Sequence, residues 1–342
     1  VANVLLGRVR GALGSVTVLA SALFGAISGS AVATVAAIGG MTIPAMKDEG
    51  YDPDYSAALA SAASLLGPMI PPSITLIVYA GLTEASVQKL FLATLTPAIL
   101  CTVAFLVYTL WYGKKNNLPK QPKKTAKEAG RIMLDAIWAL LLPVIVLGLI
   151  FSGATTVTEA AAVSCLYSAV VSLFIYKTIT FKDLMKILGD SAVSIAAIMI
   201  LVGMSKATAY VVISSQMPQL FMDFVTSITS SRFVVLLIIN VIFLILGCLM
   251  EGNCIIVMMV PLLLTLVKSF GIDLLQFGVM SAINIYIGCI TPPVGVSLLL
   301  GCKLGKTSVG GTFKAILPFL GISMVILILV TYWPSFTLWL IH

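Results

Sequence analysis

The chain has 342 residues, of which 60% are hydrophobic and only 10% are charged, and its formal net charge is +7. A soluble domain draws about a quarter of its residues from Asp, Glu, Lys and Arg, so this composition excludes a large soluble protein and predicts an all-α integral membrane protein. The only histidine is His342, and the six cysteines form no C-x-x-C pair, so we expect neither an enzyme nor a transition-metal site. We interpret the positive charge as a sign of membrane topology and predict no nucleic-acid binding.

Residues 1–112 begin with a predicted hairpin. An apolar stretch is interrupted by Ser-Gly-Ser at residues 28–30, which predicts a re-entrant helical hairpin, because unwound backbone survives in a membrane only inside protein or beside a cavity. A polar turn follows, and then an apolar helix that a Pro-Pro pair breaks within residues 67–73. An apolar span over residues 91–112 completes this part.

Residues 113–134 form a basic linker that we expect in the cytoplasm. Seven Lys or Arg residues and one Glu lie within residues 113–131, and short basic loops stay on the cytoplasmic side. Residues 135–231 contain three predicted apolar spans, and the loop over residues 214–231 lacks Lys and Arg. We therefore predict a periplasmic loop there, and a multi-pass protein of the bacterial inner membrane.

Residues 232–342 repeat the order of the first part: a hairpin that turns within residues 247–254, a helix that a Pro-Pro pair breaks within residues 288–297, and a C-terminal span. A shift of 221 residues aligns Gly50 with Gly271, Asp52 with Asp273, Gly67 with Gly288, Pro71-Pro72 with Pro292-Pro293, and Pro97 with Pro318. The first copy starts on the cytoplasmic side and the second on the periplasmic side. Such inverted repeats are typical of secondary transporters.

The repeat also predicts further spans ahead of this sequence. Under the same shift, the counterparts of residues 135–213 would precede Val1. If the repeat is complete, we expect roughly 80 residues there, or about three spans.

The four interruptions predict the binding site. Carbonyl oxygens freed at a helix break suit Na⁺, which prefers oxygen ligands, and the N-terminus of a half-helix suits a carboxylate. We therefore predict one site for Na⁺ and an anionic substrate together. The expected Na⁺ ligands are Ser28, Gly29, Ser30, Gly67, Pro71, Ser73, Glu251, Gly252, Asn253, Gly288, Thr291 and Gly295. The expected substrate contacts are Ser30, Ser73, Asn253 and Ser297.

Two glutamates lie in apolar surroundings. Glu251, at the turn of the second hairpin, either binds Na⁺ or holds the turn by hydrogen bonds, and the sequence leaves both open. Glu159 follows Thr156 by three residues, a spacing that predicts a helix cap.

Four segments carry a family resemblance. They are FGAISGS at residues 24–30, IPPSI at 70–74, TEAAA at 158–162 and TPPVG at 291–295. In this order they resemble recurrent segments of the large membrane subunit of tripartite ATP-independent periplasmic (TRAP) transporters, and the resemblance covers the whole chain. One departure is Val157, where that family commonly has Pro.

The resemblance implies an elevator-type fold with a transport domain and a scaffold domain. The transport domain would comprise about residues 11–82 and 233–302, with two hairpins and two broken helices. The scaffold would comprise residues 91–230 and the C-terminal span. The implied activity is Na⁺-coupled import of a carboxylate such as a C4-dicarboxylate or sialic acid. The implied partners are a small four-helix membrane subunit and a soluble periplasmic substrate-binding protein.

Other functions remain as alternatives at this point. A stand-alone Na⁺/dicarboxylate carrier of related hairpin architecture would need no binding protein. A channel would conduct without coupling to a gradient. An intramembrane hydrolase would need a buried Ser/His or paired-Asp site, and the sequence supplies no usable His and no pair of mid-span Asp residues.

Overall fold

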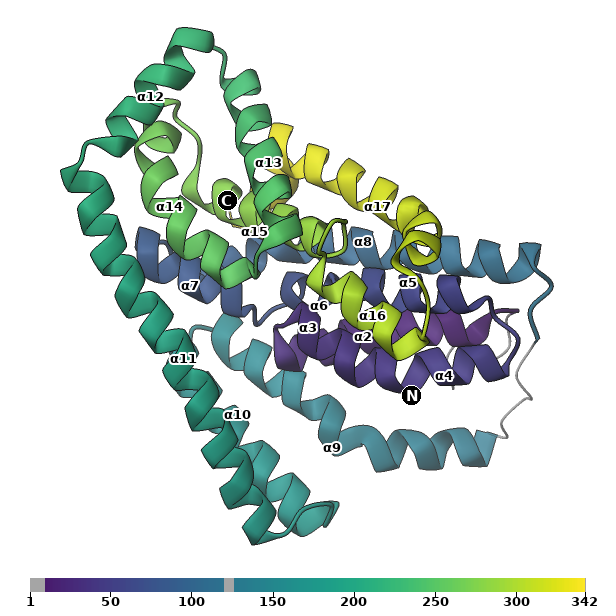
Figure 1. The fold of residues 1–342 in the computed structure, drawn as a ribbon. Coiled ribbons are helices and arrows are strands. Elements are labelled where there is room, and N and C mark those ends of the chain that lie inside the picture. Colours follow the sequence, from purple (N-terminus) through teal and green to yellow (C-terminus); the bar gives the residue numbers. More distant parts are fainter. Residues whose placement is uncertain (1–9, 120–125, 342) are drawn as a thin grey trace. The chain divides into compact units, whose positions relative to one another are not determined.

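The computed structural model describes residues 10–119 and 126–341, and every regular element in these two ranges is a helix (Figure 1). Six of the described helices are long and apolar enough to cross a membrane: Val87–Lys115, Leu134–Phe151, Val157–Ile175, Arg232–Leu249, Gly252–Ser269 and Val309–Tyr332. A bent pair, Pro53–Met69 with Ile74–Thr83, is a further candidate. The prediction of an all-α integral membrane protein is confirmed.

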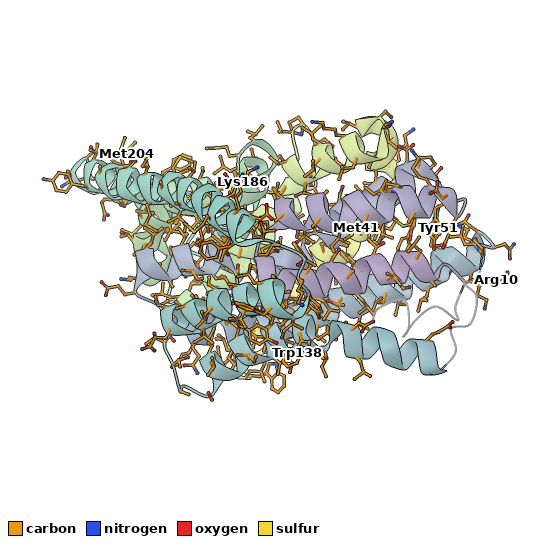
Figure 2. The ribbon with its side chains drawn as sticks, turned by 90° about the horizontal axis from the view of Figure 1, so that it is seen from below. Arg10, Met41, Tyr51, Trp138, Lys186 and Met204 are labelled. Carbon is orange, nitrogen blue, oxygen red and sulfur yellow. The ribbon has the colours of Figure 1, made fainter. Side chains whose placement is uncertain are left out.

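The chain divides into two compact units. The larger consists of Val1–Lys124 and Val212–His342, and the smaller of Thr125–Val211. Large apolar side chains cover the outside of the helices in each unit (Figure 2); Met41 of the larger unit is 64% exposed and Met204 of the smaller unit is 66% exposed. A surface of this kind indicates contact with lipid.

The first half of the larger unit contains a hairpin and a broken helix. The hairpin consists of α2 (Ala12–Ser28), α3 (Ala31–Thr34), the π-helical segment η1 (Val35–Gly39) and α4 (Gly40–Asp48). The broken helix consists of α5 (Pro53–Ala63), α6 (Leu66–Met69) and α7 (Ile74–Thr83), and α8 (Val87–Lys115) follows. Both interruptions lie at the predicted positions.

The second half has the same order. After α12 (Met217–Ile228), the hairpin consists of α13 (Arg232–Leu249) and α14 (Gly252–Ser269). The broken helix consists of α15 (Leu274–Cys289) and α16 (Val296–Gly305), and α17 (Val309–Tyr332) and the short α18 (Pro334–Leu338) follow. These interruptions also lie where the sequence predicts them.

Residues that the 221-residue shift aligns have the same structural roles. The Asp52 side chain caps α5 by accepting a backbone N–H bond of 2.8 Å, and Asp273 caps α15 through bonds of 2.8 and 3.0 Å. The turns before these caps contain Gly50, with φ of 82°, and Gly271, with φ of 60°, a conformation that favours glycine. Both Pro-Pro peptide bonds are cis. The two halves are therefore structural repeats.

Helices α8 and α17 lie in the same unit as the hairpins, although the sequence analysis placed residues 91–112 and the C-terminal span in a scaffold. Phe105 of α8 packs edge-on against Phe319 of α17, with ring centres 5.2 Å apart. Gln276 of α15 donates to two backbone carbonyls of α17, at 2.8 and 3.0 Å. The assignment of these two spans to a scaffold rests on the family resemblance and stays a prediction.

The smaller unit consists of α9 (Ala126–Phe151), α10 (Val157–Val170), the π-helical segment η2 (Val171–Ile175) and most of α11 (Phe181–Ser214). The predicted capping box is present, because Thr156 donates its backbone N–H to Glu159 at 2.7 Å and accepts from the Glu159 N–H at 3.3 Å. The basic linker is shorter than predicted, since α8 extends to Lys115 and α9 starts at Ala126. Its residues 120–125 lie outside the described residues.

Candidate functional site

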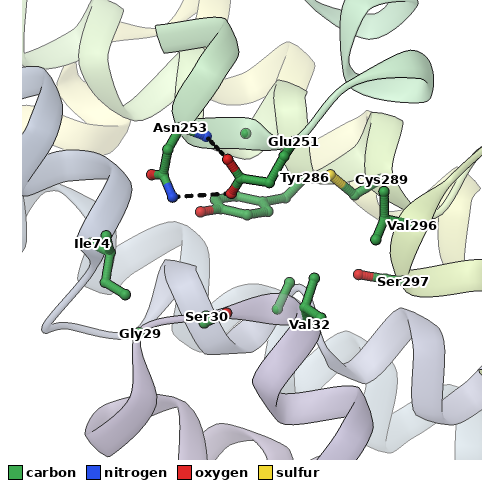
Figure 3. A pocket seen from close by; sticks show the side chains of 12 residues that line it. Gly29, Ser30, Val32, Ile74, Glu251, Asn253, Tyr286, Cys289, Val296 and Ser297 are labelled. Carbon is green, nitrogen blue, oxygen red and sulfur yellow. Dashed lines mark hydrogen bonds between the residues drawn. The ribbon is translucent and has the colours of Figure 1, made fainter. Parts of the chain in front are cut away.

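The turns of both hairpins meet both helix breaks around one cavity of the larger unit (Figure 3). We call residues 28–30 the first tip and residues 250–253 the second tip. The first break lies between α6 and α7, and the second between α15 and α16. The cavity is lined by Gly29, Ser30, Ala31, Val32, Ile74, Glu251, Gly252, Asn253, Tyr286, Cys289, Val296 and Ser297. Both repeats therefore contribute to it.

The first tip is held by hydrogen bonds between residues that are close together in the sequence. Gly29 ends α2 with φ of 60°, and its N–H donates to the Gly25 carbonyl at 2.9 Å. The Ser30 hydroxyl caps α3 by accepting from the Ala33 N–H at 3.4 Å, while Thr34 Oγ1 donates to the Ser30 carbonyl at 2.7 Å. The chain thus reverses over three small residues without a charged side chain.

Each tip packs against its own broken helix through a pair of glycines. A Cβ on Gly25 would lie 2.7 Å from the Gly67 Cα, and one on Gly67 would lie 2.6 Å from Thr34 Oγ1. In the second repeat, a Cβ on Gly288 would lie 2.5 Å from the Gly247 Cα. Gly67 and Gly288 are therefore positions of close backbone approach, a packing role that differs from the ligand role predicted for them.

The second tip is organised by a carboxylate. The Glu251 side chain caps α14 by accepting from the backbone N–H groups of Asn253 at 2.9 Å and Cys254 at 3.4 Å. It also accepts from Asn253 Nδ2 at 3.0 Å (Figure 3). Of the two roles left open for Glu251, the geometry supports holding the turn, and binding of Na⁺ stays a prediction.

Two polar residues that the sequence analysis missed connect the second tip to the rest of the site. Thr75, in the first turn of α7, donates to Asn253 Oδ1 at 3.0 Å and is also hydrogen-bonded to the hydroxyl of Tyr286 on α15. Thr75 and Tyr286 are buried. A usable signal was present, because each is a polar residue in an apolar stretch next to a Pro-Pro break.

The second break is fastened to the second tip by backbone. Gly295 donates its N–H to the Cys248 carbonyl at 3.1 Å and has φ of 50°. Thr291 Oγ1 donates to the Ile287 carbonyl at 2.7 Å, which leaves the hydroxyl oxygen as an acceptor. The carbonyls at the end of α15 therefore lie close to the turn of the hairpin.

Two serine hydroxyls at the breaks are buried without a hydrogen bond to any described residue. They belong to Ser73, which precedes the first residue of α7, and Ser297, in the first turn of α16. A buried polar group without a partner costs about 1–3 kcal/mol. Both lie at half-helix N-termini, where the backbone N–H groups and the helix dipole favour an anion.

The structure brings the predicted binding residues together in part. Six of them line the cavity: Gly29, Ser30, Glu251, Gly252, Asn253 and Ser297. The other predicted residues lie in or next to the tips and breaks but outside this lining: Ser28, Gly67, Pro71, Ser73, Gly288, Thr291 and Gly295.

Comparison with protein families gives a match over residues 1–336 to the family described as "Tripartite ATP-independent periplasmic transporter, DctM component". The similarity thus includes both repeats, the linker and the spans between them.

Three named proteins illustrate the similarity. The chain is 39% identical over 337 residues to the C4-dicarboxylate TRAP transporter large permease protein DctM of Pseudomonas aeruginosa, covering 98% of this chain and 79% of that protein. It is 35% identical over 337 residues to the sialic acid TRAP transporter large permease protein SiaM of Vibrio cholerae, with the same two coverages. It is 34% identical over 335 residues to the isethionate TRAP transporter permease protein DctMQ of Oleidesulfovibrio alaskensis, covering 98% of this chain and 53% of that protein.

Proposed function

Since the chain belongs to the DctM family of tripartite ATP-independent periplasmic transporters, we propose that it imports an organic carboxylate together with Na⁺. It is a large permease subunit, a multi-pass protein of the inner membrane and not an enzyme. This membership separates it from the stand-alone Na⁺/dicarboxylate carrier that the sequence left as an alternative.

The two buried serine hydroxyls carry the proposal for substrate. Ser73 and Ser297 each lie at the N-terminus of a half-helix, and their hydroxyls have no hydrogen-bond partner among the described residues. A carboxylate has two oxygens that accept hydrogen bonds from hydroxyl and backbone N–H groups at such positions. Two of the three named relatives carry a C4-dicarboxylate and sialic acid, which are carboxylates, and the third carries isethionate, a sulfonate. We therefore expect a carboxylate to bind at one or both half-helix N-termini.

The donor set around the tips fits Na⁺. The hydroxyls of Ser28 and Ser30, the carboxylate of Glu251 and the hydroxyl of Thr291 are oxygen donors, and they lie beside carbonyl-rich breaks. Unwound carbonyls and half-helix C-termini coordinate Na⁺ in transporters with discontinuous helices. These residues would hold the ion, whose charge would offset that of Glu251 and of the substrate.

Two partners complete the proposed transporter. A periplasmic substrate-binding protein would deliver the carboxylate, and a small four-helix membrane subunit would accompany this chain. The relative named DctMQ supports the second partner, since this chain covers only 53% of its length.

For the movement, we propose an elevator in which the larger unit carries the site across the membrane. The two tips, the two breaks and the cavity all belong to that unit. Helices α8 and α17 would move with it, because Tyr112 of α8 stacks on Tyr55 of α5 and α17 accepts hydrogen bonds from Gln276 of α15. The smaller unit would belong to the stationary scaffold.

Uptake by the complete transporter in proteoliposomes tests the proposal. We expect uptake to require an inward Na⁺ gradient and to rise sigmoidally with Na⁺ concentration. Ser297→Ala removes a hydroxyl from the proposed carboxylate site and should raise KM for the substrate about tenfold, the effect of roughly 1.4 kcal/mol. Ser281→Ala is the matched control, because Ser281 is equally buried but donates to the Phe277 carbonyl of its own helix at 2.7 Å.

Two results would contradict the proposal. Full uptake driven by a proton gradient without Na⁺ would show that uptake is not coupled to Na⁺. Equal KM values for Ser297→Ala and Ser281→Ala would show that the carboxylate does not bind at the N-terminus of α16.

A further inference from the structure

We propose that Thr75 and Tyr286 are positioning residues that latch the second tip in place over the transport cavity and fix the orientation of Asn253. This inference rests on the proposed function in one respect, namely that the cavity is the transport site. Neither residue is among those that the sequence predicts to bind Na⁺ or substrate. Together with the second tip they form a continuous chain of hydrogen bonds across both repeats.

The direction of this chain follows from its charged end. An ionised Glu251 carboxylate only accepts hydrogen bonds, so the amide of Asn253 must present Nδ2 to it, as observed at 3.0 Å. The Asn253 Oδ1 atom then faces Thr75 and accepts the Thr75 hydroxyl proton at 3.0 Å.

Thr75 has a single hydroxyl proton, and that proton is engaged with Asn253. The bond between Thr75 and Tyr286 must therefore have the Tyr286 hydroxyl as its donor. Each bond in the series polarises the next, and such chains are stronger than separate bonds. Figure 3 shows the Tyr286 ring beside the carboxylate of Glu251 at which the chain ends.

The latch joins elements that the backbone does not connect. Tyr286 lies on α15 and Thr75 on α7, while Asn253 lies in the first turn of α14, the return helix of the second hairpin. Tyr286 and Thr75 are buried, so loss of the bond between them leaves buried polar groups without a partner, which costs free energy. Movement of the second tip away from α7 must break the bond between Thr75 and Asn253.

The first tip has no equivalent latch. The 221-residue shift pairs Asn253 with Val32, Tyr286 with Leu65 and Thr75 with Val296, so each of these three polar residues has an apolar counterpart. In the described residues, the side-chain hydrogen bonds of the first tip remain within residues 28–34. The latch therefore holds only one of the two tips and is not required by the shared backbone.

The native thiol of Cys254 reports the position of the second tip. It lies next to Asn253, is partly exposed, and its backbone N–H is bonded to Glu251. We would use the complete transporter with Cys101, Cys165, Cys248, Cys289 and Cys302 replaced by Ala, and measure the rate at which N-ethylmaleimide alkylates Cys254. Thr75→Val and Tyr286→Phe should each raise this rate roughly threefold to tenfold, the factor expected for one lost hydrogen bond.

Tyr79→Phe is the matched control. Like Tyr286, Tyr79 is a buried tyrosine, but it lies on α7 and outside the cavity lining. Its hydroxyl donates to the Leu274 carbonyl of α15 at 2.7 Å, so it also connects α7 with α15. We expect its alkylation rate to stay within about twofold of the parent. Thr75→Ser keeps the hydroxyl, so its alkylation rate should equal that of the parent. The double variant of Thr75→Val with Tyr286→Phe should have an alkylation rate close to that of the faster single variant, because the two residues belong to one hydrogen-bond network.

Thermal unfolding of each variant separates the latch from a general loss of stability. Equal alkylation rates in Tyr286→Phe and Tyr79→Phe would overturn the latch, even if Thr75→Val failed to fold. The alkylation assay needs no transport, so absence of Na⁺-dependent uptake in the parent would refute the proposed coupling and leave the result on the latch standing.

Discussion

The two hairpin tips share a backbone arrangement and are held in different ways. The first tip is held by shape, because Gly25 and Gly67 let the backbones touch and its hydrogen bonds stay local. The second tip has the same glycine contact but adds a carboxylate cap and the bonds from Thr75 and Tyr286. A repeat can therefore conserve its geometry through glycine, proline and cap positions while its polar side chains diverge.

The return arms of the hairpins differ as well. In the first hairpin, the α3 segment passes into the π-helical η1 at Val35 before α4 begins. In the second, α14 is an uninterrupted α-helix of 18 residues. The cap residues differ in strength, since Ser30 is a neutral cap and Glu251 is a charged one. Hydrogen bonds to a charged group are about twice as strong as neutral ones, so the second tip depends more on single side chains.

The largest effect is expected at the glycine contacts that the two hairpins share. Gly288→Ala would place a Cβ 2.5 Å from the Gly247 Cα and 2.8 Å from the Cys248 N, and backbone atoms cannot yield as a side chain can. We expect uptake to be abolished and the protein to be destabilised by about 3 kcal/mol. Uptake and the thermal unfolding midpoint measure the two effects.

The first repeat provides the comparison for this substitution. Gly67→Ala should be less severe, because its nearest atom is the Thr34 hydroxyl at 2.6 Å, although the Ser30 carbonyl lies only 2.9 Å away. Gly321→Ala is the control, since Gly321 is an exposed helical glycine with no atom within 4 Å of its Cβ position. If Gly288→Ala retained parent uptake, close packing would not be what holds the second tip.

Glu251→Gln should have the next largest effect, because it changes the group at which the latch ends. A neutral amide loses the charge assistance of three hydrogen bonds and can present an NH₂ group to the Asn253 N–H. We expect the half-saturating Na⁺ concentration and the substrate KM to rise roughly tenfold or more, since bonds to charged groups contribute about 1.5–3 kcal/mol. Uptake measured over a range of Na⁺ and substrate concentrations separates the two constants.

Ser30→Ala is the corresponding change in the first tip, because Ser30 caps α3 as Glu251 caps α14. Loss of a neutral cap costs about 1 kcal/mol, so its effect should be smaller than that of Glu251→Gln. Equal effects of the two substitutions would mean that the tips do not differ in the way the hydrogen bonds indicate.

Much of the fold follows from the sequence because proline, glycine and aspartate act locally. A few residues determine where helices end and begin through local effects alone, independently of distant residues. They are the two Pro-Pro pairs, Gly29 and the cap residues Asp52 and Asp273. The repeat could be recognised for the same reason, since these residues recur at one spacing.

The site was predictable only in part. Unwound segments can be expected to converge on a cavity, and Ser30, Glu251 and Ser297 do line it. The roles of Thr75 and Tyr286 depend on contacts between residues 211 positions apart in the sequence, which local patterns do not encode. The packing of α8 and α17 on the broken helix α5 is likewise a tertiary contact, made through Tyr112 and Phe319 around Tyr55, and local patterns do not distinguish such faces from lipid-facing ones.

The smallest effect is expected from Ser28→Ala, at the edge of the first tip. Its hydroxyl makes only long contacts, 3.4 Å to Thr34 Oγ1 and 3.5 Å from the Ser30 N–H, so its removal should cost little stability. If Ser28 contributes one oxygen to a Na⁺ site, the half-saturating Na⁺ concentration should rise about twofold to fivefold while substrate KM at saturating Na⁺ stays unchanged. Ser15→Ala is the matched control, because Ser15 lies on the same helix and its hydroxyl is 3.3 Å from that of Thr109, away from the tip. If both variants shift the Na⁺ dependence equally, the effect is a general one of α2, and Ser28 is not a Na⁺ ligand. A shift confined to Ser28→Ala would place a Na⁺ ligand in the first tip, which is held by shape.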